Sequence, residues 1–143
     1  MTALIQTKRI YEEPIRADGT RVLVDRLWPR GVSKEKSALY AWLKDLAPSN
    51  ELRKWFHAHP ESWMIFRRQY FKELNRPDSV AALSELYRLV SERKRLTLLF
   101  ASNDEQHNNA VILRELLGGI RKPPTGTGPL RATRNRQAKR LPV

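Results

Sequence analysis

The stretch Val22-Leu23-Val24-Asp25-Arg26-Leu27-Trp28-Pro29-Arg30-Gly31 decides how the rest of the chain is interpreted. It begins with short apolar and β-branched residues, which is typical of a buried strand. Charge, tryptophan, proline and glycine follow within a few positions, and this composition ends a strand and turns the chain outward. In open α/β sheets ligands bind beyond the carboxyl ends of the strands, so Asp25, Arg26 and Arg30 lie where a binding site is expected.

The composition is that of one globular domain. The chain has 143 residues, of which 41% are hydrophobic, so it is long enough to bury a core. It contains no cysteine, which excludes disulfides, thiolate metal sites and a thiol nucleophile. The sequence has no apolar run of roughly 18 residues, and residues 1–9 lack the features of a signal peptide. We therefore expect a cytoplasmic protein that makes no contact with a membrane.

The formal net charge of +12 indicates a negatively charged partner. Residues 121–143 carry seven basic and no acidic side chains, which leaves +5 (12 minus 7) for residues 1–120. A basic arm can neutralise nucleic-acid phosphates without sequence specificity, whereas a solvated tail that aids solubility is the alternative. We expect residues 1–120 to form the domain and residues 121–143 to be a basic, extended or disordered extension.

Apolar periodicity predicts strands that alternate with helices. Strands are expected over residues 4–11, 21–26 and 96–101, with a further extended segment over residues 39–47. The second of these strands should have both faces buried, as in a sheet with helices on each side. The order of elements favours an α/β fold, a single compact domain with a small, mostly parallel sheet flanked by helices.

The expected helices are placed by their start and stop signals. A short helix is expected after Ser33 and a longer one from Ser49 to about His57. The third should begin at Pro60, and the fourth after Asp78 or Ser79. A last helix should follow Ser102 and Glu105, which have the spacing of a capping box, and should end at Gly118-Gly119.

Polar side chains follow two of the predicted strands, over residues 25–31 and 102–109. If the two strands are neighbours in a parallel sheet, these exits face each other at one edge. Asp25 and His107 are the candidate catalytic residues, as a base and a proton carrier. The candidate ligand-binding residues are Arg26, Trp28, Arg30, Gly31, Ser49, Arg53, Asp104, Asn108 and Asn109.

The chemistry of these residues points to an anionic ligand. The guanidinium groups of Arg26 and Arg30 match phosphate or carboxylate oxygens, and the start of the last helix adds free N–H groups. Asn108 and Asn109 can donate to a carbonyl or an oxyanion. The sequence has no glycine-rich phosphate loop, no zinc-ligand spacing and no motif for a cofactor, so we expect neither a cofactor nor a metal.

Each candidate also has a structural alternative. Asp25 and Arg26 can pair with neighbours at the sheet edge, and His107 can hydrogen-bond a carbonyl in the first turn of a helix. Trp28 can be part of a packing corner, and Ser49 has the position of a helix cap.

Four segments carry a resemblance to a known family: VLVDRLWPRGVSKEK, AWLKDLAPSNELRKWF, WMIFRRQYFKEL and LTLLFASNDEQHNNAVILRELL. These segments resemble the YeaO-like bacterial proteins of the domain-of-unknown-function 488 family, and the resemblance covers residues from about Arg9 to Leu117. The resemblance implies an α/β fold and no particular reaction. Longer relatives carry a Cys-His-Arg group where this chain has Asn108-Asn109-Ala110, so the resemblance does not bring thiol chemistry to this chain. The family's recurrent polar positions correspond to Asp25, Arg26, Arg30, Gly31, Ser49, Arg53, Asp104, His107, Asn108 and Asn109.

Three hypotheses follow from the sequence. The first is a cytoplasmic protein with an anion- or nucleotide-binding pocket at the strand edge, with or without enzymatic activity. The second is a nucleic-acid-associated or regulatory protein that binds through its basic body and tail. The third is a domain that assembles with itself or with a protein partner through exposed aromatic residues.

Overall fold

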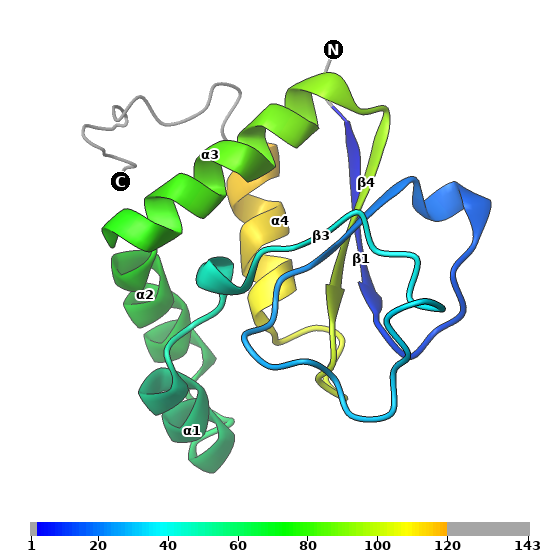
Figure 1. The fold of residues 1–143 in the computed structure, drawn as a ribbon. Helices are drawn as coiled ribbons and strands as arrows, with labels where there is room; N and C mark the ends of the chain where they lie inside the picture. The colour runs from blue at the N-terminus through cyan, green and yellow to red at the C-terminus, as the bar shows by residue number, and fades with distance from the viewer. Residues whose placement is uncertain (1–2, 120–143) are drawn as a thin grey trace.

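The computed structural model describes residues 3–119, and their strands and helices form one α/β domain (Figure 1). The strands are β1 (Leu4–Arg9), β2 (Thr20–Leu23), β3 (Ala41–Trp42) and β4 (Arg95–Phe100). The α-helices are α1 (Asn50–Ala58), α2 (Trp63–Glu73), α3 (Pro77–Glu92) and α4 (Asn109–Gly119), and two short 3₁₀ helices are η1 (Arg16–Asp18) and η2 (Lys44–Leu46). The expected extension over residues 121–143 lies outside the described residues. Between residues 3 and 119 no helix has the length and apolarity needed to cross a membrane.

The four strands form one parallel sheet in the order β1-β4-β2-β3, which confirms the predicted sheet. Leu4 of β1 lies opposite Arg95, and Thr20 of β2 lies opposite Leu96. Strand β4 is therefore flanked by β1 and β2, and residues Leu96 to Phe100 are buried. Because parallel neighbours end at the same edge, the exits of β2 and β4 lie side by side.

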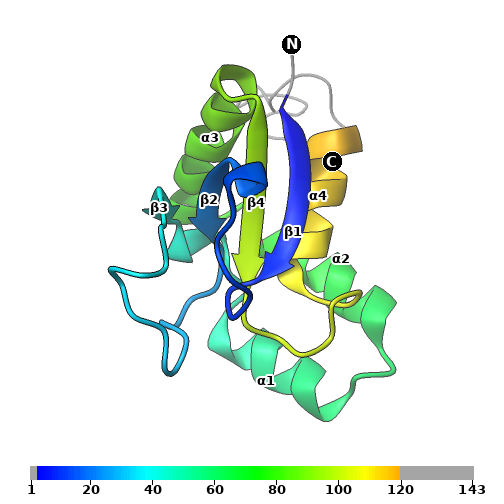
Figure 2. The same cartoon turned by 90° about the vertical axis from the view of Figure 1, so that its right-hand side faces the viewer.

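The α-helices cover only one face of this sheet. In Figure 2, α3 and α4 lie behind β4 and β1, whereas η1 lies in front of them. On the helical face, Val22 and Leu98 join the main core with apolar residues of α2, α3 and α4. On the other face, Leu23 and Leu99 pack against a smaller cluster. Its other members are Ile10, Trp28, Val32, Leu39, Trp42 and Ala101.

The expectation of helices on both faces of the second strand was therefore wrong. Both faces of this strand are buried, as its apolar run predicts, but the second face is covered by Trp28, Val32 and Leu39 of the loop over residues 24–40 and by Trp42 of β3. The two tryptophans supply enough apolar surface to take the place of a helix, since a large aromatic side chain buries about 150–250 Å² in a typical core.

The helix boundaries show which start signals are specific. Ser49 caps α1 as predicted, because its Oγ accepts a hydrogen bond from the Leu52 N–H at 3.1 Å. Pro60 does not begin a helix. Residues 60 and 61 form a turn, and α2 begins at Trp63. The short helix expected after Ser33 is also absent: residues 34–38 form turns, which end in a left-handed Ala38 with φ 54°.

The last two helices begin at different residues from those expected. Pro77 is the first residue of α3 and Arg76 precedes it as N-cap, so Asp78 and Ser79 lie inside the first turn rather than before it. Helix α4 is capped by Asn108, whose Oδ1 accepts from the Val111 N–H at 3.0 Å. Residues 102–105 therefore belong to the preceding loop.

The expected extended segment over residues 39–47 is divided in two. Its first part contains β3, and its second part is η2, which returns the chain toward the helices. The Tyr70 hydroxyl donates to the Leu46 carbonyl and so holds η2 against α2.

Candidate functional site

The exits of β2 and β4 are joined by two hydrogen bonds. The Ala101 N–H donates to Asp25 Oδ2 at 2.8 Å, and Asn109 Nδ2 donates to the Val24 carbonyl at 2.8 Å. The first bond follows β4 directly and the second comes from the first turn of α4. The structure thus brings Asp25 and Asn109 to the same edge of the sheet, as the strand-exit argument predicts.

Asp25 is largely buried and accepts a backbone hydrogen bond. Desolvation by burial raises the pKa of the Asp25 carboxyl, and this outweighs the opposing effects of the Ala101 N–H, the Asn109 side chain and the Arg53 charge. Burial also raises the pKa of the Tyr70 hydroxyl well above its usual value, with a further contribution from the Asp25 charge. Asp25 therefore has a structural role, because its carboxylate holds the segment after β2 against the segment after β4.

Arg26 points away from Asp25 toward the loop that precedes α1. Its Nη2 donates to the Ala47 carbonyl at 3.1 Å, and its Nε donates to the Pro48 carbonyl at 3.4 Å. Both acceptors are backbone oxygens, so these bonds orient the guanidinium without neutralising its charge. The positive charge of Arg26 remains available to a ligand.

Ser49 makes a second set of contacts that its role as a helix cap does not require. Its N–H donates to Glu73 Oε1 at 2.7 Å, and its Oγ donates to Glu73 Oε2 at 2.5 Å. The carboxylate of Glu73 also lies 3.7 Å from Arg76 Nη2. The start of α1 is thereby fixed to the end of α2. Sequence reasoning identified Ser49 and missed Glu73, because a partner 24 residues away leaves no local pattern.

Two surface hollows adjoin at this place, and both are lined by Arg26 and Arg76. The first has a volume of about 370 Å³, and its other lining residues are Ser49, Asn50, Glu51 and Lys54. The second has a volume of about 380 Å³, and its other lining residues are Asp45, Ala47, Glu73, Pro77, Asp78 and Ser79. We name them the basic hollow and the acidic hollow. Lys54 and Arg76 are not among the candidates predicted from the sequence, since single exposed basic residues are common.

Three residues of the decisive stretch lie away from both hollows. Trp28 packs edge-on against Trp42 with ring centroids 5.4 Å apart, and its Nε1 donates to the Val32 carbonyl at 2.8 Å. This is the packing corner that the sequence offered as an alternative. Arg30 is exposed, and Gly31 has a φ of +81° that allows the turn.

The loop from Asp104 to Asn108 organises the start of α4. Asp104 Oδ1 accepts from the N–H groups of Gln106 and His107, both at 3.0 Å. The Gln106 N–H contributes most to holding the pKa of the Asp104 carboxyl below its usual value; burial opposes it, and the smaller effects of the His107 contacts add to the lowering. Asn108 Nδ2 donates to the Asp104 carbonyl at 2.8 Å.

His107 is engaged at the same loop. Its Nδ1 lies 3.1 Å from Asp104 Oδ2, and its ring meets the Trp63 ring edge-on with centroids 4.9 Å apart. Arg53, another candidate, is exposed on α1 and acts on Asp25 through its charge. Neither Asp25 nor His107 lines the hollows, and of the candidate ligand-binding residues only Arg26 and Ser49 do. Asn109 lies at the sheet edge with Asp25, and Asp104 and Asn108 lie in the loop with His107. Within residues 3–119 no three His, Asp or Glu side chains converge as a metal-ligand set.

Comparison with known proteins assigns the family. Residues 4–122 match the family model DUF488-N3i, which is described as the inactive DUF488-N3 subclade. The chain belongs to the DUF488 family. It is 41% identical over 118 residues to the uncharacterized protein YeaO of Escherichia coli (strain K12), covering 81% of this chain and 98% of that protein. It is 42% identical over 115 residues to the uncharacterized proteins Rv3073c of Mycobacterium tuberculosis (strain H37Rv) and Mb3100c of Mycobacterium bovis, covering 80% of this chain and 94% of theirs. No solved structure matches the chain.

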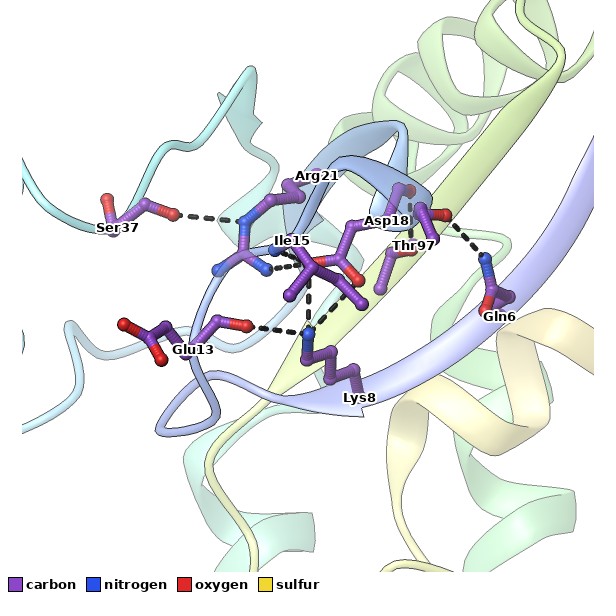
Figure 3. Close-up of polar contacts among 9 residues, drawn as sticks. Gln6, Lys8, Glu13, Ile15, Asp18, Arg21, Ser37 and Thr97 are labelled. Atoms are coloured by element: carbon purple, nitrogen blue, oxygen red, sulfur yellow. Dashed lines mark hydrogen bonds and ion pairs between the residues drawn. The ribbon is translucent and has the colours of Figure 1, made fainter.

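This DUF488 domain also has a buried ionic cluster, formed by Lys8, Asp18 and Arg21 (Figure 3). Asp18 Oδ2 lies 2.6 Å from Arg21 Nη1 and 3.0 Å from Lys8 Nζ. Thr97 Oγ1 donates to the Asp18 carbonyl at 2.6 Å, and Arg21 Nε donates to the Ser37 carbonyl at 3.0 Å. The cluster ties η1 to β1, β2 and β4. None of these residues is among the candidates predicted from the sequence.

Proposed function

We propose that this chain is a binding protein for a small anionic ligand, a nucleotide or another phosphorylated metabolite, which it holds in the basic hollow. The observation that carries the proposal is the lining of that hollow. Arg26, Lys54 and Arg76 contribute three positive charges, and Glu51 is the one carboxylate among the lining residues. The net charge of +2 matches a phosphate group.

The backbone at the hollow adds to this preference. Asn50 and Glu51 are the first two residues of α1, so their N–H groups have no acceptor within the helix. The positive end of the helix dipole lies at the same point. Anions bind at such places through several N–H groups at once, and nearby guanidinium groups add bidentate contacts to phosphate oxygens.

Binding rather than catalysis is supported by what the candidate catalytic residues do. The Asp25 carboxylate accepts a hydrogen bond from the Ala101 N–H, and His107 pairs with Asp104 in the loop before α4. Asn108 caps α4, and the Asn109 side chain donates to the backbone of β2. The description of the matching subclade as inactive agrees with a role that involves no reaction.

A ligand screen on the intact chain tests the proposal. Nucleotides and sugar phosphates are added to the wild type, to the double variant Lys54→Gln/Arg76→Gln, and to the control Arg68→Gln. Arg68 is an exposed basic residue of α2 that lines neither hollow. We expect a rise in melting temperature that the control keeps and the double variant loses, because only native protein binds the ligand. A rise of equal size in all three proteins, or none with any phosphate compound, contradicts the proposal.

Nucleic-acid binding is the second candidate, and the charge distribution favours it. Seven basic and no acidic residues follow position 120, and the remainder of the chain carries +5. The logarithm of the affinity for short oligonucleotides should then fall linearly with the logarithm of the salt concentration. Truncation after Gly119 should remove most of that binding. Unchanged binding by the truncated chain contradicts this second candidate and leaves the first untouched.

A further inference from the structure

The acidic hollow carries the opposite charge to the basic hollow beside it. Asp45, Glu73 and Asp78 line it together with the shared Arg26 and Arg76, which gives a net charge of −1 against +2 in the basic hollow. The two arginines stand in the common wall. A single ligand that fills both hollows therefore meets positive charge at one end and negative charge at the other.

The carboxylates of the acidic hollow are placed by ordered elements. Asp45 belongs to η2, and Asp78 is the second residue of α3. Ser79 is buried, and its Oγ donates to the Asp45 carbonyl at 2.9 Å, which fixes η2 against the start of α3. The spacing between Asp45 and Asp78 is thus set by the fold rather than by exposed loops.

The three carboxylates are not equivalent. Glu73 accepts two hydrogen bonds from Ser49 and lies near Arg76, so its charge is already used within the protein. Asp45 and Asp78 are exposed, and within residues 3–119 neither forms an ion pair. Arg26 and Arg76 line the same hollow but form no ion pair with either carboxylate, and the lining keeps a net charge of −1.

Resting on the proposed function, we infer that the ligand is zwitterionic: a phosphate monoester that also carries a protonated amine. Its phosphate binds in the basic hollow against Lys54, Arg76 and the first N–H groups of α1. Its ammonium group binds in the acidic hollow between Asp45 and Asp78. Complementary charge at both ends gives the ligand one orientation and disfavours phosphates that lack the amine.

Two isosteric probes test this inference on the full chain. O-phosphoethanolamine has the ammonium group, and propyl phosphate has a methyl group in its place. Titrations followed by the backbone amide signals of Asn50 and Glu51 give both dissociation constants. We expect O-phosphoethanolamine to bind about fivefold more tightly, since exposed charge pairs contribute modestly. Glycerophosphoethanolamine, a diester, is the third probe: weaker binding supports a free monoester as the ligand. Equal binding overturns the monoester part of the inference and assigns the site to lipid headgroups with the same amine and phosphate.

Variants separate this inference from the proposal on which it rests. In Asp45→Asn/Asp78→Asn the preference for O-phosphoethanolamine should fall to about onefold while propyl phosphate binds as before, and the control Glu61→Gln should keep the preference. If both probes bind the wild type equally and both are lost in Lys54→Gln/Arg76→Gln, the inference is wrong and the proposed function stands. If neither probe binds the wild type, the inference is wrong, and the screen of nucleotides and sugar phosphates decides the proposed function. The comparison of probes on the wild type holds even if a variant fails to fold.

Discussion

The Asp25 carboxylate accepts the backbone N–H of Ala101 at 2.8 Å, and this bond joins the chain that leaves β2 to the chain that leaves β4. It sits at the edge where an α/β sheet ordinarily presents its ligand site. In this protein the carboxylate closes that edge instead. The charged lining is displaced to the start of α1, where Arg26 reaches the Ala47 and Pro48 carbonyls.

Replacing Asp25 with alanine should lower the free energy of unfolding by about 1–3 kcal/mol, because it leaves the Ala101 N–H without its acceptor in a poorly hydrated place. Asp25→Asn should have little effect or be stabilising at pH 7, since the amide oxygen can accept the same bond and no charge is buried. Urea denaturation of both variants measures the difference. Equal losses in the two variants would show that the bond to Ala101 is not what Asp25 provides.

The same residue predicts a pH dependence. Burial raises the pKa of Asp25 in the folded protein above that of the unfolded chain, so the native state binds the proton more tightly. As the pH rises from about 4, through the raised pKa, the wild type should lose stability relative to Asp25→Asn. Unfolding free energies of the two proteins between pH 4 and 7 test this. A constant difference over that range, or one of opposite sign, contradicts the prediction.

Ser49→Ala should destabilise the fold by about 1–2 kcal/mol, because it removes both the cap of α1 and the hydroxyl that binds Glu73. Ser62→Ala is the matched control. Ser62 occupies the N-cap position of α2 but its side chain makes no capping hydrogen bond, so its loss should change stability by less than about 0.5 kcal/mol. Thermal or urea unfolding separates the two, and equal effects would mean that the contacts of Ser49 contribute nothing.

The sequence predicts what depends on neighbouring residues. The apolar run from Val22 to Val24 is a buried strand and its extension, and Ser49 caps a helix. It also placed the polar exits of β2 and β4 together, because parallel topology alone brings them to one edge. The prediction of a helix that begins at Pro60 was wrong, because proline favours turns as well as the first position of a helix.

The remainder of the site could not be predicted because it depends on contacts between distant segments. The bond from Ser49 to Glu73 spans 24 residues, and the bond from Thr97 to the Asp18 carbonyl spans 79. Lys54 and Arg76 are recognised only when the hollow around them is known. No periodicity in the chain encodes these pairs, so a sequence can identify Arg26 and Ser49 and still miss most of the lining of the basic hollow.

Gly19→Ala should be strongly destabilising. Its φ is +65°, and an added Cβ would lie 2.5 Å from the Arg95 Cβ and 2.6 Å from the Arg95 carbonyl oxygen, so β4 would have to move. Gly31→Ala is the matched control, because Gly31 has a φ of +81° but open space around it. Gly31→Ala should lower the free energy of unfolding by about 1–2 kcal/mol, which is the cost of the backbone strain alone, and Gly19→Ala should lower it by clearly more. Equal losses of stability in the two variants would show that the contact between the added Cβ and Arg95 costs no stability.

The ionic cluster on the face without helices gives the largest expected loss of stability. Asp18→Ala would leave the buried guanidinium of Arg21 without its carboxylate, and breaking a buried pair in this way destabilises by about 3–5 kcal/mol. Glu115→Gln, which breaks the exposed pair with Arg67, should lower stability by less than about 1 kcal/mol.

Burial opposes ionisation of Asp18, but the hydrogen bonds from the Ile15 N–H, Lys8 and Arg21 outweigh it and hold the pKa of the Asp18 carboxyl below its usual value. The unfolded chain therefore binds the proton more readily, and this stabilisation is present above about pH 4 and lost as the pH falls through the lowered pKa. Denaturation of the wild type and Asp18→Ala between pH 2 and 7 should show two curves that converge toward low pH, and parallel curves would contradict this account of the cluster.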